Sequence, residues 1–384
     1  MEHLINQRVK NIEISGIRKF FNLVADVEDL ISFTIGQPDF PTPDHVKKAG
    51  IQAIEKDFTS YTHNAGTLEL RKAACQFVNK KYRLDYKAES EVIVTMGASE
   101  AIDITFRTIL EEGTEVLLPG PIYPGYEPII RMMGAVPVHV DIRKNQFRFT
   151  LETMKPYITD KTRCIVLPYP SNPTGVSLSS DELREIADFM KDKDIFILAD
   201  EIYSELTFDQ KHTSIASFIK EKTIVINGLS KSHSMTGWRI GFLFAPESLA
   251  KHILKVHQYN VSCANSIAQK AAYEALTIGI NDADIMKEEY AKRREYVYNR
   301  LKSMGLEVVK PDGAFYFFVK IPETISLNSF DFALKLVQET RVAVVPGSAF
   351  SEFGEGYFRL SFACSMANLE RGLNQMETFF QQQK

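Results

Sequence analysis

The sequence predicts an α/β protein whose large domain holds a mostly parallel, seven-stranded sheet sandwiched by helices, followed by a small α+β domain. Short apolar runs rich in β-branched residues alternate with helical stretches through the middle of the chain, which is the pattern of strand and crossover helix. Short strand-like runs separated by turn residues fill the last eighty or so positions. A chain of 384 residues is also long enough for two cores.

Six nearly continuous apolar runs mark the first strands of the sheet. They are VIVT (92–95), EVLLP (115–119), VPVHV (136–140), CIVLP (164–168), IFILA (195–199) and TIVIN (223–227). Runs without polar alternation are typical of parallel strands that are covered on both faces. Only ten residues separate TIVIN from Trp238, too few for a parallel crossover, so WRIGFLFA is expected to run antiparallel as the seventh strand.

Two helices are well marked. In SSDELREIADFMKDKD, Ser179 and Glu182 have the spacing of a capping box, and the apolar positions from Leu183 to Met190 fall on one face, so a crossover helix is expected there. A second amphipathic helix is predicted from Asp282 to Met304, ended by Gly305. Beyond it, LEVV, AFYFFV, VAVV and YFRLSF are expected to be strands and SFDFALKLVQE a helix.

Composition excludes several classes of protein. The net charge of -4, the pI near 6.1 and the lack of basic runs argue against a nucleic-acid partner. The first thirty residues lack the apolar core of a signal peptide and no run reaches membrane-spanning length, so we expect a cytoplasmic protein with no membrane partner. The four cysteines are widely spaced and the eight histidines are unclustered, so neither disulfides nor a metal site is expected.

Polar residues follow the predicted strands where each strand ends. VIVT is followed by Gly97, Ala98 and Ser99 at the start of a helix, a position suited to an anion. Asn172 follows CIVLP, Asp200 and Tyr203 follow IFILA, and Lys231 follows TIVIN. Because the carboxyl ends of parallel strands meet at one edge, these groups are expected to line one crevice.

A phosphorylated ligand that needs an amine and a buried acid fits this set. Neither GxGxxG nor GxxxxGK[ST] is present, which argues against a dinucleotide or ATP. Pyridoxal phosphate needs a lysine for its aldehyde, a carboxylate for its ring nitrogen, and cations and N–H groups for its phosphate. Taken alone, a lysine such as Lys231 is usually a solvated surface charge, so the surrounding residues carry the argument.

Motifs along nearly the whole chain resemble the class I aminotransferases of fold type I, which use pyridoxal phosphate. The motifs are IGQPDFPTP (35–43), YTHNAGTLELR (61–71), GAS (97–99), PIYPGYEP (121–128), SNPTG (171–175), DEIYSELTF (200–208), GLSKSHSMTGWRIG (228–241) and RLSF (359–362). The resemblance implies a division into an N-terminal segment (1–44) that packs on the small domain, a large cofactor-binding domain (45–285) and a small domain (286–384).

The resemblance implies a role for each residue around the cofactor ring. Lys231 matches the Schiff-base lysine that also carries the proton, and Asp200 the carboxylate that pairs with the pyridine nitrogen. Asn172 and Tyr203 match the donors to the phenolic oxygen, and Tyr123 the stacking ring. Read from local sequence alone, Asp200 is equally a helix cap, Asn172 a turn residue and Tyr123 a packing residue.

The resemblance also implies how the phosphate is held. Gly97, Ala98, Ser99 and Arg239 match its binding groups, and Tyr61 matches a tyrosine that comes from the neighbouring subunit, so a homodimer with shared active sites is expected. Many relatives carry a serine where this chain has Gly228. Two alternatives stay open: Ser230 replaces that serine, or its hydrogen bond to the phosphate is absent. From sequence alone, Arg239 also suits an edge charge.

On the substrate side, Arg359 matches the arginine that binds the α-carboxylate, with Asn172 and the backbone near Gly36 beside it. A strand-face salt bridge explains Arg359 without the motifs. Ser99 stands where some relatives that prefer acidic substrates carry lysine, which argues against a pocket dedicated to aspartate. The segment with His257, Tyr259 and Asn260 is expected either to meet a long polar substrate or to pack between domains.

The resulting hypothesis is an aminotransferase that moves an amino group between an amino acid and a 2-oxo acid, with glutamate and 2-oxoglutarate as one pair. Within this class, the chain also resembles the N-acetyl-LL-diaminopimelate aminotransferases, which implies N-acetyl-LL-diaminopimelate of lysine biosynthesis as the specific donor. Three alternatives stay open: an aspartate or aromatic amino acid aminotransferase, a C–S β-lyase with the same lysine, and a cofactor-binding protein without catalysis.

Overall fold

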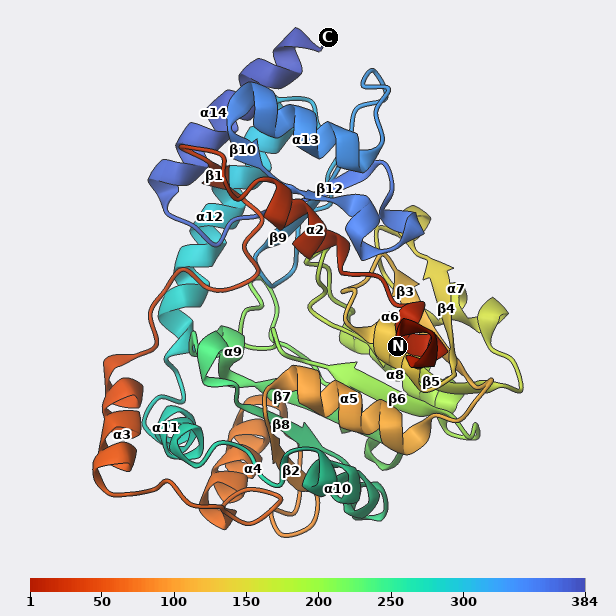
Figure 1. The fold of residues 1–384 in the computed structure, drawn as a ribbon, viewed down its shortest axis with the longest axis vertical. Helices are drawn as coiled ribbons and strands as arrows, with labels where there is room; N and C mark the ends of the chain where they lie inside the picture. The colour runs from red at the N-terminus through yellow and green to blue at the C-terminus, as the bar shows by residue number, and fades with distance from the viewer. Residues whose placement is uncertain (384) are drawn as a thin grey trace.

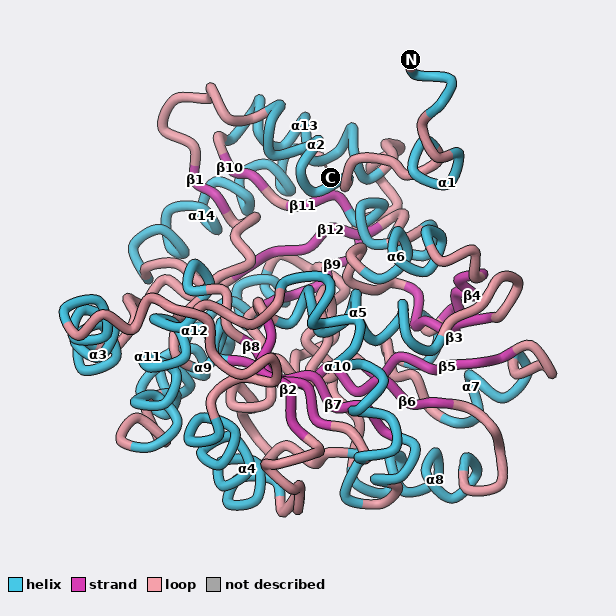
Figure 2. The backbone as a smooth tube through the Cα atoms, turned by 60° about the horizontal axis from the view of Figure 1, so that its bottom comes forward, coloured by secondary structure: helices cyan, strands magenta, loops and turns pink. Residues whose placement is uncertain are grey.

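The computed structural model describes residues 1–383 and contains the predicted seven-stranded sheet (Figures 1 and 2). Its strands are β2 (Val92–Thr95), β3 (Glu115–Gly120), β4 (Val136–Asp141), β5 (Thr162–Leu167), β6 (Phe196–Asp200), β7 (Thr223–Gly228) and β8 (Gly241–Phe244). The strand order is β2-β8-β7-β6-β5-β3-β4. Only β8 is antiparallel to its neighbours β2 and β7, so the short connection before it was interpreted correctly.

Alternating side chains of the strands pack against two helical layers. In β5, Cys164 and Val166 belong to one buried cluster and Ile165 and Leu167 to the other. The first face is covered by α5 (Ala98–Ile109), α6 (Tyr126–Met132) and α10 (Glu247–Val261), and the second by α4 (Leu68–Tyr82), α8 (Ser180–Met190) and α11 (Ser266–Thr277). In Figure 2, α4 and α8 lie below the strands and α5 and α6 above them. The predicted sandwich is confirmed.

Helix α8 begins with the predicted capping box. The backbone N–H of Glu182 donates to Oγ of Ser179 at 3.3 Å, and the N–H of Ser179 donates to the carboxylate of Glu182 at 2.7 Å. Leu183, Ile186 and Met190 face the core, as expected. The second predicted helix is α12 (Ala283–Ser303), which begins and ends within one residue of the prediction.

The C-terminal part differs in two places from the predicted elements. Its sheet has the order β11 (Val345–Pro346), β12 (Tyr357–Ser361) and β9 (Tyr316–Lys320), while β10 (Val342–Ala343) pairs elsewhere, so VAVV is divided between two sheets. The prediction of a strand at LEVV is wrong: Val308 makes only an isolated bridge with Val319. The chain then turns away, because Pro311 has no N–H and the N–H groups of Asp312 and Gly313 donate to the carbonyl of Gly175.

Two helices pack on this small sheet. Helix α13 (Ser329–Thr340) is the predicted one. Helix α14 (Met366–Gln382) was not predicted, although Ser365 caps its start through the N–H of Asn368, and Leu369, Leu373 and Met376 line its buried face.

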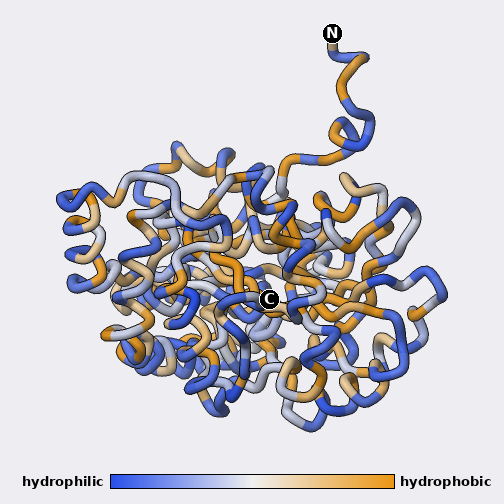
Figure 3. The backbone as a smooth tube through the Cα atoms, turned by 90° about the horizontal axis from the view of Figure 1, so that it is seen from below, coloured by the Kyte–Doolittle hydropathy of each residue, from blue (hydrophilic) through white to orange (hydrophobic). Residues whose placement is uncertain are grey.

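The first residues of the chain lie against the small sheet. Strand β1 (Ile31–Ser32) pairs in parallel with β10, and Phe20 and Phe33 are fully buried among the residues of the small domain. Phe20 lies on α2 (Gly16–Leu23), whereas the preceding turns, which include α1 (Gln7–Lys10), project from the body in Figure 3. These contacts support the division at residues 44 and 285, which stays a prediction. Helix α3 (Asp44–Glu55) begins at that first boundary.

Across residues 1–383, no helix is long and apolar enough to cross a membrane. No cluster of potential metal ligands occurs within the same range.

Replacing Ser179 with alanine is expected to lower the free energy of unfolding by about 1 kcal/mol, because the N–H of Glu182 loses its acceptor. Chemical denaturation of the cofactor-free protein measures this change. Ser180→Ala is the matched control, since this neighbouring side chain is exposed and should change the value by less than about 0.5 kcal/mol. Equal losses in the two variants would contradict the capping role.

Candidate active site

The polar residues that follow the strands come together at the carboxyl edge of the sheet. Gly97 follows β2, Asn172 follows β5, Asp200 ends β6, and Lys231 lies on the single turn α9 (Leu229–Ser232) directly after β7. The small domain adds Arg359 from β12. The candidate site therefore draws on residues of both the seven-stranded sheet and the small sheet.

Lys231 lies among cations and below the N-terminal segment. Its Nζ donates a hydrogen bond to the carbonyl of Gly36 at 2.6 Å and lies 5.6 Å from the centre of the Tyr203 ring. Removal of the ammonium from water lowers the pKa of Lys231 to about 8, helped by the charges of Arg359 and Arg239 and opposed by Asp200. A substantial fraction of Lys231 is thus a neutral amine, the form that attacks an aldehyde, at mildly alkaline pH.

Asp200 is a buried acid held by two donors. The hydroxyl of Tyr126 donates to Oδ2 at 2.6 Å, and the N–H of Ile202 donates to Oδ1 at 3.2 Å. Burial raises the pKa of Asp200, while these donors and Lys231 oppose the rise. Turns rather than a helix follow β6, so Asp200 is not a helix cap. Tyr126 was missed from the sequence, although it lies within the PIYPGYEP motif.

Arg359 has a fixed place between the domains. Only 2% of its surface is exposed; Nη1 donates to Oδ1 of Asn172 at 2.9 Å, and Nη2 to the carbonyl of Thr34 at 2.8 Å. Its guanidinium stacks between the rings of Tyr316 (4.3 Å) and Phe350 (5.0 Å). Within residues 1–383 its Nε has no partner and no carboxylate pairs with it, so it is not a strand-face salt bridge. A buried, unpaired cation of this kind is suited to an incoming carboxylate.

Tyr203 is buried beside these residues. Its hydroxyl lies 2.8 Å from that of Tyr316. Burial raises the pKa of Tyr203 well above its usual value, so it is a neutral hydrogen-bond donor. Tyr123 is partly exposed and meets the ring of Tyr126 edge to face, with 5.7 Å between centroids.

The start of α5 forms a cradle with Arg239. Gly97 has φ +83°, and a Cβ placed on it would lie 2.7 Å from Nη2 of Arg239, so only glycine lets the guanidinium come this close. Ala98 and Ser99 are the first two residues of α5, whose N–H groups are free for an anion. Arg239 is itself at φ +52°, a strained conformation of the kind found at binding sites, and is held by the carbonyl of Thr236 at 2.9 Å.

Packing explains why position 228 is a glycine. A Cβ there would lie 3.2 Å from the carbonyl oxygen of Ile240 and 3.3 Å from Cα of Gly241, so a serine at this position would press on β8. Ser230 is buried one residue before Lys231. Its part in binding phosphate stays a prediction.

The remaining candidates lie outside this crevice. Tyr61 is 87% exposed and Tyr259 equally so. His257 is fully buried, with Nδ1 at 2.7 Å from Glu100 and Nε2 at 2.9 Å from the carbonyl of Asn64, so both of its ring nitrogens are occupied within the protein. Asn260 reaches Asp103 at 3.5 Å.

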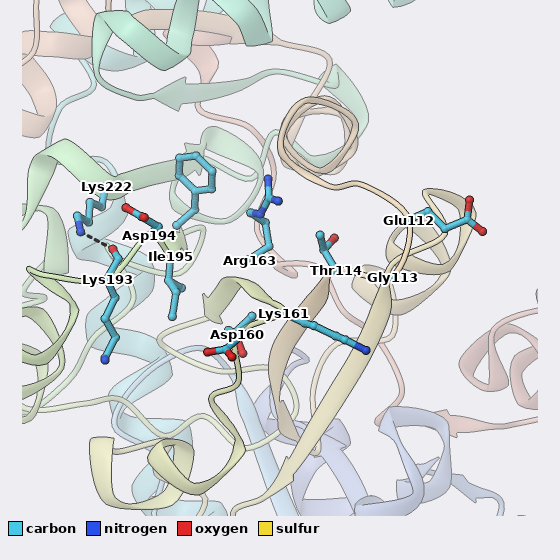
Figure 4. Close-up of a pocket in the computed structure, with 12 residues that line it drawn as sticks. Glu112, Gly113, Thr114, Asp160, Lys161, Arg163, Lys193, Asp194, Ile195 and Lys222 are labelled. Atoms are coloured by element: carbon cyan, nitrogen blue, oxygen red, sulfur yellow. Dashed lines mark hydrogen bonds between the residues drawn. The ribbon is translucent and has the colours of Figure 1, made fainter.

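A cavity of about 750 Å³ lies at the opposite, amino-terminal edge of the same strands (Figure 4). It is lined by residues at the starts of β5 and β6, among them Thr162 and Phe196, and by charges of both signs such as Arg163 and Asp194. Lys222 at its margin is occupied with backbone carbonyls, including that of Lys193. This cavity is distinct from the candidate site, because it lies at the opposite ends of the strands and its charged residues are of both signs.

Comparison with known proteins decides the family. The model of aminotransferase class I and II matches residues 28–376. The chain belongs to this family. It is 62% identical, over 99% of its length and 96% of the relative's, to the probable N-acetyl-LL-diaminopimelate aminotransferase of Bacillus subtilis (strain 168). Two solved structures are also similar. An aromatic aminotransferase from Pyrococcus horikoshii OT3 is 39% identical, with 95% of this chain and 99% of the other covered and a TM-score of 0.89. A single mutant of the Thermus thermophilus aspartate aminotransferase is 33% identical, with 97% of this chain and 99% of the other covered and a TM-score of 0.92.

The protein is thus an aminotransferase of fold type I that depends on pyridoxal phosphate, as the sequence predicted. The residues present fit that cofactor. The Gly97 and Arg239 cradle suits its phosphate, the buried Asp200 suits its ring nitrogen, and Lys231, with its lowered pKa, suits its aldehyde.

Gly97→Ala is expected to weaken pyridoxal phosphate binding roughly 10- to 100-fold, because the new methyl group displaces Arg239 and one charged hydrogen bond is lost. Equilibrium titration of the cofactor-free variant measures the change. Gly113→Ala is the matched control: its φ is +77° but a Cβ there meets nothing within 4 Å, so it carries similar backbone strain without touching the cradle. Equal weakening by both variants would refute the cradle.

Proposed function

We propose that this aminotransferase uses N-acetyl-LL-diaminopimelate and its 2-oxo acid as one substrate pair, and glutamate and 2-oxoglutarate as the other, in lysine biosynthesis. The observation that carries the substrate is the 62% identity over 99% of the chain to a relative named for it. Ser99 stands where some relatives that prefer acidic substrates carry lysine, which argues against a pocket dedicated to aspartate.

Pyridoxal phosphate, when bound, supplies an aldehyde that accepts the amino group and a ring that takes up the electrons of the substrate's Cα–H bond. In our proposal Asp200 keeps a proton on the ring nitrogen, while Asn172 and Tyr203 donate hydrogen bonds to the phenolic oxygen. Tyr123 covers the ring. Ala98, Ser99, Ser230 and Arg239 hold the phosphate, with Gly97 giving room for Arg239.

Lys231 is the proposed base that removes the proton from the substrate Cα. Its lowered pKa makes the neutral amine available, and its contact with the carbonyl of Gly36 keeps Nζ at the mouth of the crevice. Lys231 is the only amine among the residues proposed to contact the cofactor or the substrate, so it is the group that carries the proton in both half-reactions.

Arg359 is proposed to bind the α-carboxylate. Its planar guanidinium is already fixed by Asn172, Thr34 and two aromatic rings, so little side-chain entropy is lost when the carboxylate arrives. The N-terminal segment at Gly36 lies over the same place, which keeps water from the reacting atoms.

A homodimer with shared sites is part of the proposal. Tyr61, in the connection between α3 and α4, is largely exposed. Exposed apolar side chains also occur on α3 (Ile51 and Ile54), at the start of α12 (Ile285) and after α11 (Ile278), and α3 and α11 lie side by side (Figure 1). A second copy that covers these residues would bring Tyr61 to the phosphate of its partner. We place this dimer in the cytoplasm, where the four free cysteines stay reduced.

With the holoprotein in hand, amino donors should be added one at a time, and the visible absorbance of the cofactor followed. N-acetyl-LL-diaminopimelate is expected to convert the cofactor to its amine form with a kcat/KM at least about tenfold above that of aspartate or phenylalanine, and 2-oxoglutarate should reverse the change. A preference for aspartate or an aromatic amino acid would overturn the substrate. Release of thiol and oxo acid without the amine form would indicate a β-lyase.

The shared site predicts a specific behaviour of hybrid dimers. A dimer of one Lys231→Ala chain and one Tyr61→Ala chain contains one site with both native residues and one with neither. Purified through two different tags, it should bind one equivalent of pyridoxal phosphate with native affinity, whereas the Tyr61→Ala homodimer binds roughly tenfold more weakly. A hybrid without a native-affinity site would place Tyr61 in its own chain's site or in none.

A further inference from the structure

Tyr316 is a buried phenol that the sequence did not single out. It is fully buried at the start of β9, and within residues 1–383 its hydroxyl has one hydrogen-bond partner, the hydroxyl of Tyr203 at 2.8 Å. The register of the small sheet explains its position: Ser361 pairs with Tyr316 and Arg359 with Phe318, so the side chains of Arg359 and Tyr316 share one face as diagonal neighbours.

The two phenols have only two protons to distribute. If Tyr203 donates its proton to the phenolic oxygen of the cofactor, it has none left for Tyr316, and the 2.8 Å contact requires Tyr316 to donate into the oxygen of Tyr203. Tyr316 has no competing acceptor among the described residues. Donation into one hydroxyl strengthens the hydrogen bond that this hydroxyl makes in turn.

Two further contacts keep the Tyr316 hydroxyl in place. A Cβ on Gly36 would lie 3.3 Å from it, so the N-terminal segment approaches this oxygen closely and leaves it little room to move. On the ring face, the guanidinium of Arg359 lies 4.3 Å from the centroid. The ring of Tyr316 and its hydroxyl therefore serve two different neighbours, the substrate arginine and Tyr203.

We propose that Tyr316 is a positioning residue, whose hydroxyl donates to Tyr203 and thereby directs the proton of Tyr203 to the phenolic oxygen of the cofactor. This inference rests on the proposed role of Tyr203. It adds a contribution of the small domain to the electronics of the cofactor, separate from substrate binding by Arg359.

The pH titration of the holoprotein's visible absorbance tests this role. A donor to the phenolic oxygen stabilises the deprotonated chromophore, so Tyr316→Phe, which keeps the ring and removes the hydroxyl, should raise the midpoint by roughly half to one pH unit. In a Tyr203→Phe background the same change should shift the midpoint by less than about 0.3 pH unit, since its effect passes through Tyr203.

The affinity for succinate, a carboxylate that does not react, tests the separate role of the Tyr316 ring. Tyr316→Phe should leave succinate affinity unchanged, and Tyr316→Leu should weaken it, because only leucine removes the surface on which Arg359 stacks. An unchanged midpoint in Tyr316→Phe, or an equal shift with and without the Tyr203 hydroxyl, would overturn the inference. A wild-type protein that binds no pyridoxal phosphate would instead refute the proposed function.

Discussion

The site depends on an excess of positive charge at the carboxyl edge of the sheet. The charges of Arg239 and Arg359 act on Lys231 there, and Asp200 is the buried acid beside it. Removing cations from water costs free energy unless anions pair with them. In the proposed function, the phosphate of the cofactor and the carboxylate of the substrate supply those anions. Burial is the main cause of the lowered pKa of Lys231, and the charges of the two arginines lower it further.

The fold places these charges through backbone geometry. Parallel strands deliver Asp200 and Lys231 to one edge, and the glycines at 97 and 241 let α5, β8 and Arg239 approach closely, since a Cβ on Gly241 would lie 2.9 Å from the N of Ala98. The other residues of the site come from the N-terminal segment and from the small sheet in the C-terminal part of the chain. Thr34 and Gly36 approach from the N-terminal segment and Arg359 from the small sheet, so the complete crevice exists only when both ends pack on the large domain.

Much of this was predictable because the signals were local. Continuous apolar runs identified the strands of the large sheet, and the short connection before WRIGFLFA identified its antiparallel member. The strand predicted at LEVV does not form, because the chain just beyond it is directed by hydrogen bonds to the carbonyl of Gly175, which is far away in the sequence. Tyr126 and Tyr316 were missed for a similar reason: a buried tyrosine has the same local pattern as a core residue, and only the fold shows that its hydroxyl reaches Asp200 or Tyr203. The strained Arg239 likewise has no sequence signal.

The titration of Lys231 in the cofactor-free protein tests the central claim most directly. Competitive labelling with acetic anhydride across a pH series, read by mass spectrometry of the peptide that contains Lys231, gives the pKa of this amine. The account predicts a midpoint at about 8, and a higher one when the positive charge is removed in Arg359→Met. A midpoint near 10.5, the value of a lysine in water, would contradict the claim that buried positive charge prepares this site.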